Sequence, residues 1–146
     1  MPSRFVFRLD RLLRLRELTE DARLRQLAEA RARTGRSENA RDGLMAAEGE
    51  AESALASICG EGPLDLDALK SSWGELERTR AGLLKAGEDL ARKRHEESSA
   101  RTAYAAAGRD RTVLSHLRQR KELEHLREYD RWEQKLLDEA GARRRS

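Results

Sequence analysis

The hydrophobic positions of this chain recur at intervals of three and four residues, a spacing that predicts α-helix rather than strand. In the first half the repeat is a regular 4-3 series: Ala40, Leu44, Ala47, Ala51, Ala54 and Ile58. In the second half the same spacing continues with polar interruptions: Leu69, Trp73, Leu76, Arg80, Leu83, Gly87 and Leu90. Such a repeat leaves one narrow apolar seam along each helix, which is typical of a coiled coil.

The two helices are separated by one strong turn signal. The only prolines are Pro2 and Pro63, so two long stretches contain no obligate helix breaker. The turn reads Gly60-Glu61-Gly62-Pro63. We expect a single coiled-coil domain over 1–146: helix one at about 8–59, a turn and short helical piece over 60–70, helix two at about 71–141, and a basic tail over 142–146.

Local capping signals set these boundaries. Asp65 or Asp67 would cap the short piece, and Ser71 or Ser72 would cap the second helix, with Glu75 completing a capping box after Ser72. Gly141, just before three arginines, predicts the end of that helix.

A short connection favours antiparallel packing of the two helices within one chain. If residue 59 lies opposite residue 71, the numbers of facing residues add to about 130. Phe5 and Phe7 then meet the region 123–126, and everything beyond it projects as an unpaired helix. The predicted fold is all-α: a long antiparallel two-helix coiled-coil hairpin with an overhanging C-terminal helix. The overhang carries Tyr129, Trp132, Leu136 and Leu137.

The seam is less regular outside the central repeat. Upstream, Leu9, Leu12, Leu15 and Leu18 form a drifting face, and the pattern in the second half restarts at Val113. These shifts of phase predict stutters in the supercoil. The expected core positions are Leu12, Leu15, Leu44, Ala47, Ala51, Ile58, Trp73, Leu76, Leu83, Leu90, Tyr104 and Leu117.

Composition excludes several other classes of protein. Charged residues make up 39% of the chain and aromatic residues 4%, too few large side chains to fill a compact globule. Val and Ile are scarce, so a β-sheet lacks its usual material. Leucine recurs throughout and prolines are few, which opposes disorder. No apolar run approaches the length of a membrane span, and one cysteine forbids an internal disulfide.

No pattern in the chain indicates catalysis. No glycine-rich loop follows a strand, and His95, His116 and His125 lack the spacing of metal ligands. Cys59, beside the turn, is expected to be a small helix-end residue. We therefore expect no enzymatic activity, no cofactor and no metal. The glycines inside the helices are either tolerated or mark close helix contact at Gly87 and Gly108.

Both ends of the chain carry residues that resemble a known family. The opening reads Phe5-x-Phe7-x-Leu9-x-x-Leu12-Leu13-x-Leu15-Arg16-Glu17, and the closing stretch includes Glu128-Tyr129 and Arg131-Trp132-Glu133-Gln134-Lys135-x-Leu137-Asp138-Glu139-Ala140. These segments resemble the bacterial flagellar export protein FliJ. His125, Leu126 and Arg127 depart from the more uniformly charged stretch of that family, and the region 35–110 matches it only as generic coil.

The resemblance implies a non-enzymatic component of the flagellar type III export apparatus, at the cytoplasmic face of the inner membrane. Proteins of this family are two-helix coils similar to the stalk of rotary ATPases. The implied partners are the flagellar export ATPase hexamer, the cytoplasmic domain of an export-gate membrane protein, and export chaperones. The chain alone would be a monomer of about 16.6 kDa.

The overhang is the expected docking element for the ATPase ring, and the region of about 40–90 would face the gate or a chaperone. The residues expected to contact the ring are Phe5, Phe7, Arg118, Arg120, Arg127, Tyr129, Arg131, Trp132, Gln134, Lys135, Leu136 and Asp138.

Three other interpretations of the same sequence stay open. One is the equivalent stalk of a virulence injectisome, and another is a generic homodimeric coil. The third is a nucleic-acid-binding coil, motivated by a pI near 9.3 and the Arg143–Arg145 run. Acidic residues are interleaved with the basic ones, however, so no continuous basic stripe emerges. We therefore expect neither nucleic acid nor direct membrane insertion.

Overall fold

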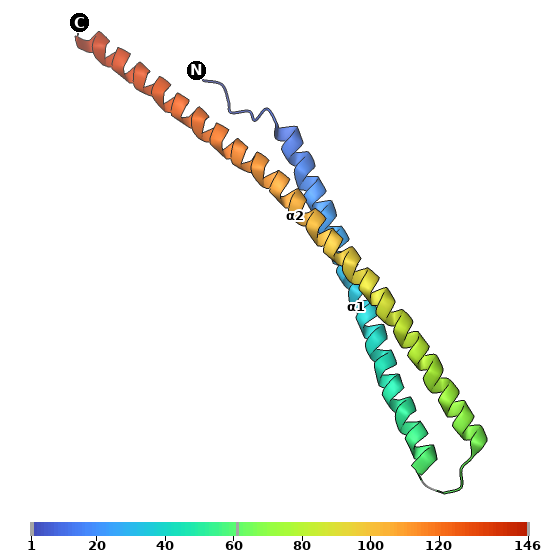
Figure 1. Cartoon of the computed structure of the whole chain (residues 1–146). Helices are drawn as coiled ribbons and strands as arrows, with labels where there is room; N and C mark the ends of the chain where they lie inside the picture. Colours follow the sequence, from blue (N-terminus) through green and yellow to red (C-terminus); the bar gives the residue numbers. More distant parts are fainter. Residues whose placement is uncertain (1, 61, 146) are drawn as a thin grey trace. The chain divides into compact units, whose positions relative to one another are not determined.

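The chain forms two long helices joined by a short turn (Figure 1). The computed structural model describes residues 2–60 and 62–145. Helix α1 is Asp10–Gly60 and helix α2 is Leu66–Arg145. No strand occurs in the described residues. The predicted all-α hairpin of two packed helices is therefore confirmed.

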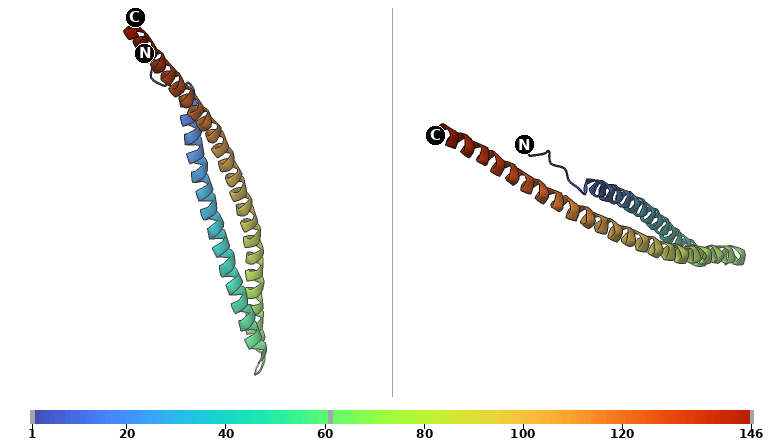
Figure 2. Two further views of the ribbon diagram at one scale, coloured as in Figure 1. Left: turned by 90° about the vertical axis from the view of Figure 1, so that its left-hand side faces the viewer. Right: turned by 90° about the horizontal axis from the view of Figure 1, so that it is seen from above.

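The helices divide into two compact units, each combining a stretch of α1 with the stretch of α2 that packs against it. The first unit takes in the chain up to Leu24 and the chain from Ala103 onward. The second unit is Arg25–Thr102 and contains the turn. Figure 2 shows both helices from two further sides, coloured along the sequence so that the residues of each unit can be found.

Cross-helix contacts of the second unit fix its antiparallel register. Ser37 Oγ donates a hydrogen bond of 2.6 Å to Asp89 Oδ2. Arg80 Nη2 lies 3.0 Å from Glu52 Oε1 and its Nε lies 3.2 Å from Glu48 Oε1. The residue numbers of these pairs add to between 126 and 132, as the sequence arithmetic predicted.

The first unit keeps the same register. An ion pair of 3.7 Å joins Asp10 to Arg118, and the ring of Phe5 packs on that of His125 with centroids 5.7 Å apart. The residue numbers of these pairs add to 128 and 130. The predicted meeting of Phe5 with the region 123–126 is confirmed.

The buried residues of both helices follow one heptad phase. On α1 they are Leu13, Leu27, Ala30, Thr34 and Ser37, separated by three, four or whole multiples of seven residues. On α2 they are Leu76, Leu90 and Ala107, separated by two heptads and then by two heptads and three residues, so they stay in one phase. The predicted stutters are therefore wrong. The apolar pattern breaks because polar residues occupy seam positions while the helices keep their phase; they include Arg16, Glu20, Glu48, Lys93, Glu97 and Arg111.

The predicted core is partly wrong as a consequence. Leu12 is 36% exposed, Leu15 57% and Trp73 47%, so none of these three lies in the seam. The seam of α1 passes through Leu13 instead, because its phase is set two heptads later by Leu27. Sequence reading followed the leucines at 9, 12, 15 and 18; the last three lie on the solvent side of α1, and Leu9 precedes the helix.

The other expected core positions contribute to the seam to different degrees. Leu76 and Leu90 are each only 2% exposed and are the largest fully buried side chains of the described chain. The remaining positions are half-buried: Leu44, Ala47, Ala51, Ile58, Leu83, Tyr104 and Leu117. The core is a thin row of side chains that cover one another without a second layer.

The structure extends α2 at both ends beyond the predicted boundaries. Asp65 Oδ1 accepts hydrogen bonds from the backbone N–H of Asp67 and of Ala68, at 3.1 and 3.3 Å, and caps the helix. The helix then runs straight through residues 66–72, so a separate short piece and a second cap at Ser71 or Ser72 are wrong. Gly62, with a φ of 84°, supplies the left-handed turn residue; Glu61 lies outside the described residues.

The C-terminal end of α2 also differs from prediction. Gly141 does not stop the helix, and the basic run to Arg145 is helical. A single glycine costs only about 1 kcal/mol in a helix, and arginines in the last turn favour the negative end of the helix dipole. A Cβ placed on Gly87 or Gly108 would meet nothing within 4 Å, so neither glycine marks close helix contact.

Two hydroxyls sit inside the seam of the second unit. Thr34 Oγ1 donates to the carbonyl oxygen of Ala30 at 3.0 Å, and lies 3.3 Å from that of Lys93 on the other helix. Ser37 is bound to Asp89, as described above. These bonds satisfy polar groups that the seam would otherwise bury at a cost.

The Ser37–Asp89 bond predicts a pH dependence of stability. The hydrogen bond from Ser37 is the main cause that holds the pKa of Asp89 below its ordinary value, and Lys93 and Arg92 add to it. A lowered pKa in the folded state stabilises the fold above the unfolded value of about 3.9. That contribution is lost as the pH falls through the lower, folded pKa. We expect the stability advantage of the native chain over Asp89→Asn to shrink as the pH is lowered from 6 toward 2, measured by thermal unfolding followed by circular dichroism.

Ser37→Ala removes the main cause of the lowered pKa and serves as the partner variant. Its stability difference from the native chain should shrink over the same acid range. An advantage that stayed constant down to the lowest pH would contradict this assignment.

Candidate docking surface

The N-terminal segment of the first unit is extended and packs on α2. Residues 2–7 precede the first turn of α1, and the N–H of Asp10 donates to the carbonyl oxygen of Phe7 at 3.1 Å. The side chain of Phe7 is only 8% exposed. Phe7 is therefore part of the internal packing of this unit, and the expectation that it offers a surface to a partner is wrong.

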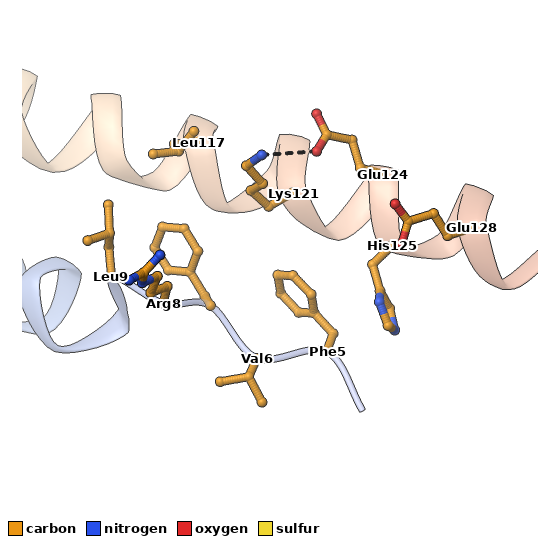
Figure 3. A pocket seen from close by; sticks show the side chains of 10 residues that line it. Phe5, Val6, Arg8, Leu9, Leu117, Lys121, Glu124, His125 and Glu128 are labelled. Carbon is orange, nitrogen blue, oxygen red and sulfur yellow. Dashed lines mark hydrogen bonds and ion pairs between the residues drawn. The ribbon is translucent and has the colours of Figure 1, made fainter. Parts of the chain in front are cut away.

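A cavity of about 640 Å³ lies between this segment and α2 (Figure 3). Its walls come from residues 5–9 and from one face of α2. Lys121 Nζ lies 3.2 Å from Glu124 Oε2 on that face, and the ring of Phe5 lies against His125. The segment thus covers the face of α2 that follows the end of the helix pair.

Beyond this segment, α2 continues without α1 beside it. We name the stripe of His125, Tyr129, Trp132 and Leu136 the tail stripe; its spacing of four, three and four puts these residues on one side of the helix. His125 and Trp132 keep the seam position of Leu76 and Leu90, whereas Tyr129 and Leu136 keep the position of the exposed Trp73, beside the seam. Tyr129 and Leu136 are exposed, and the Trp132 ring is half-buried beside that of Tyr129, with centroids 5.8 Å apart.

More exposed apolar side chains lie farther round the same helix: Leu126 and Leu137 about a quarter turn from the tail stripe, and Leu123 toward the opposite side. They add apolar surface to a helix that has no neighbour beside the stripe in the structure. Sequence analysis placed Leu137 on the overhang but assigned none of these three leucines to the docking surface. Their spacing of three and eleven residues was the sequence signal that could have placed them on one side of the helix.

The charged residues expected to contact a partner are distributed around the overhang. Arg118 is already paired with Asp10 of α1. Arg120, Arg127, Arg131 and Lys135 are exposed. Helix geometry places Arg127 and Arg131 on the side away from the tail stripe and Lys135 on its flank. Gln134 and Asp138 are exposed on the far side as well.

A second surface lies near the turn, in the second unit. Leu55, Cys59, Leu69 and Trp73 line a cavity of about 590 Å³. Trp73 Nε1–H donates a hydrogen bond of 2.8 Å to Glu77, which holds the indole on the surface. Sequence reasoning missed this surface because it assigned Trp73 to the seam.

The described part of the chain contains no group of His, Cys, Asp and Glu side chains that could hold a metal ion. None of its helices combines the length and the apolar character that crossing a membrane requires.

The family model described as flagellar FliJ protein matches residues 5–146. The chain belongs to the FliJ family. No curated protein and no solved structure matches it. Family membership places this FliJ-family chain among the structural components of flagellar export. The match begins at Phe5 and includes the overhang, so both parts of the first unit described above lie within the family's span.

Proposed function

We propose that this chain is a non-enzymatic stalk of the flagellar export apparatus, which docks through its C-terminal overhang into the ring of the export ATPase and promotes its assembly. The tail stripe carries the proposal, because it presents two aromatic rings and a leucine on a helix that has lost its neighbour. Aromatic residues are enriched at the centres of protein interfaces.

The charges around the overhang support the same interaction. Arg127 and Arg131 take part in no ion pair of the described residues, so both are available to acidic loops of a ring. In this proposal the tail stripe supplies the affinity, and the basic side chains orient the helix during entry.

Coupling to other components is the second part of the proposal. The surface around Trp73 lies in the second unit, within the region expected to face the export gate or an export chaperone. An exposed indole beside two leucines offers an apolar contact at the turn. The chain would then act at the cytoplasmic face of the inner membrane with one docking surface in each unit.

The docking proposal is tested by removing the tail stripe. We expect Trp132→Ala combined with Leu136→Ala to abolish stimulation of the flagellar export ATPase, because these two side chains are half of the tail stripe and include its largest ring. The circular dichroism spectrum should not change, since alanine is a good helix former. ATP hydrolysis is measured against the concentration of added chain.

Leu15→Ala combined with Leu18→Ala is the matched control. It removes two exposed leucines from α1 of the same unit and should leave stimulation intact. Undiminished stimulation by the Trp132/Leu136 variant would refute docking through the stripe.

A further inference from the structure

The tail stripe has the form of half of a coiled coil. In heptad notation Tyr129 and Leu136 occupy a positions, and His125 and Trp132 occupy d positions. His125 and Trp132 continue the seam position of Leu76 and Leu90 on α2, and Tyr129 and Leu136 lie directly beside that seam. A helix is therefore the shape of partner that this face fits.

The charges that flank the tail stripe favour a second copy of the same helix in the antiparallel orientation. The g positions, which border the core of a coiled coil, are Glu128 and Lys135. In a pair of antiparallel copies, Glu128 of each copy faces Lys135 of the other, so the contact has two attractive pairs. In a parallel pair, Glu128 would instead face Glu133 at an e position, which is repulsive.

The core layers favour the same orientation. When facing residue numbers add to 261, Tyr129 packs against Trp132 and His125 packs against Leu136, each twice. A parallel pair would stack His125 on His125. No ion pair of the described residues uses Glu128 or Lys135, so both charges are available for this contact.

The N-terminal segment limits the extent of the contact. The ring of Phe5 already packs on His125, so a second helix has free access only beyond that residue. Of the four core layers, the two outer ones, which pair His125 with Leu136, are shared with Phe5. Such a short contact is expected to be weak and reversible.

We propose that the tail stripe binds the tail stripe of a second copy of this chain as an antiparallel helix pair about a two-fold axis. The hairpin needs only one chain, so the protein is monomeric when dilute and pairs as its concentration rises. The pair covers Trp132 and Leu136 and therefore masks the surface that the proposed function assigns to docking. The self-association itself does not depend on the ATPase.

Charge exchange on the full-length chain tests the proposal. Mass in solution is measured by sedimentation equilibrium up to about 1 mM. We expect the native chain to pass from 16.6 kDa toward twice that mass. Glu128→Lys and Lys135→Glu, each alone, should weaken pairing about tenfold, because two attractive pairs become repulsive.

An equal mixture of the two variants should pair again, because both facing positions are then of opposite charge. Asp138→Lys and Arg131→Glu change the charge by the same amounts on the far side of the helix, and they should pair as the native chain does. A third variant, Trp132→Ala, should stay monomeric.

Disulfide trapping reports the orientation. In a Cys59→Ser background, a mixture of chains with Glu128→Cys and chains with Lys135→Cys should form the mixed disulfide in preference to either symmetric one. A native chain that stays monomeric throughout the range, a mixture that does not regain pairing, or a predominant symmetric disulfide would each overturn the proposal. A chain that binds the ATPase but never itself would do so while leaving the proposed function intact.

Discussion

Replacing Leu90 with alanine is expected to lower the free energy of unfolding by about 2–4 kcal/mol. Leu90 is one of the two largest fully buried side chains, at 2% exposure. A two-helix coil has no second layer of side chains that could collapse into the gap, so the loss should approach the upper part of that range. Urea unfolding followed by circular dichroism at 222 nm measures it.

Leu84→Ala provides the control on the same helix. Leu84 is 69% exposed, and its truncation removes the same atoms without opening a cavity. Its effect should stay within about 0.5 kcal/mol. If the two substitutions destabilised the chain equally, Leu90 would not be a seam residue and the heptad phase assigned to α2 would be wrong.

The ion pair of Glu20 with Arg111 is expected to give the second large effect. Both side chains occupy seam positions, and they are 17% and 37% exposed. Glu20→Ala leaves the guanidinium of Arg111 partly buried without this partner, and we expect a loss of about 1–2 kcal/mol. Replacing both residues by leucine should instead raise stability above that of the native chain by about 1–2 kcal/mol, because an apolar pair avoids the cost of desolvating two charges.

An exposed ion pair between the same residue types serves as the control for the stability loss expected of Glu20→Ala. Glu29 lies 3.9 Å from Arg33 on the surface of α1, and Glu29→Ala should cost less than about 0.5 kcal/mol. Denaturant unfolding of all four chains gives the comparison. A double-leucine chain less stable than the native chain would show that the two charges stabilise the seam more than burial of two leucines does.

The positions of Leu90 and of the Glu20–Arg111 pair also explain why the sequence predicted the seam correctly in one region and wrongly in another. The 4-3 repeat located one of the two seam positions of each heptad correctly, at Leu44, Leu76 and Leu90, where leucine occupies the seam itself. Its alternate positions, such as Ala54 and Trp73, are exposed, and the seam runs one residue away from them. The repeat failed around Leu12 and Leu15, because the seam there runs through Arg16 and Glu20 and the leucines lie outside. Charged residues on a seam carry no hydrophobic signal, so the break in pattern looked like a change of phase.

In the candidate docking surface, too, some features followed from the sequence and others did not. The overhang and its unpaired aromatic residues followed from counting residues on either side of the turn. The burial of Phe7 did not, because an extended segment has no helical period from which its inward side can be read. The exposed indole of Trp73 was missed for a related reason: its spacing fits the seam, and only the packing of Leu76 against α1 turns it outward.

The sequence by itself determined that the chain is helical, that it turns once near Pro63, and that facing residues add to about 130. It determined these because helix period, turn chemistry and residue count are local properties. Only the tertiary structure decided which side of each helix is buried and where α2 begins and ends. Those features depend on the contacts that polar side chains such as Glu20, Ser37 and Asp65 make with partners, and a one-dimensional pattern does not contain them.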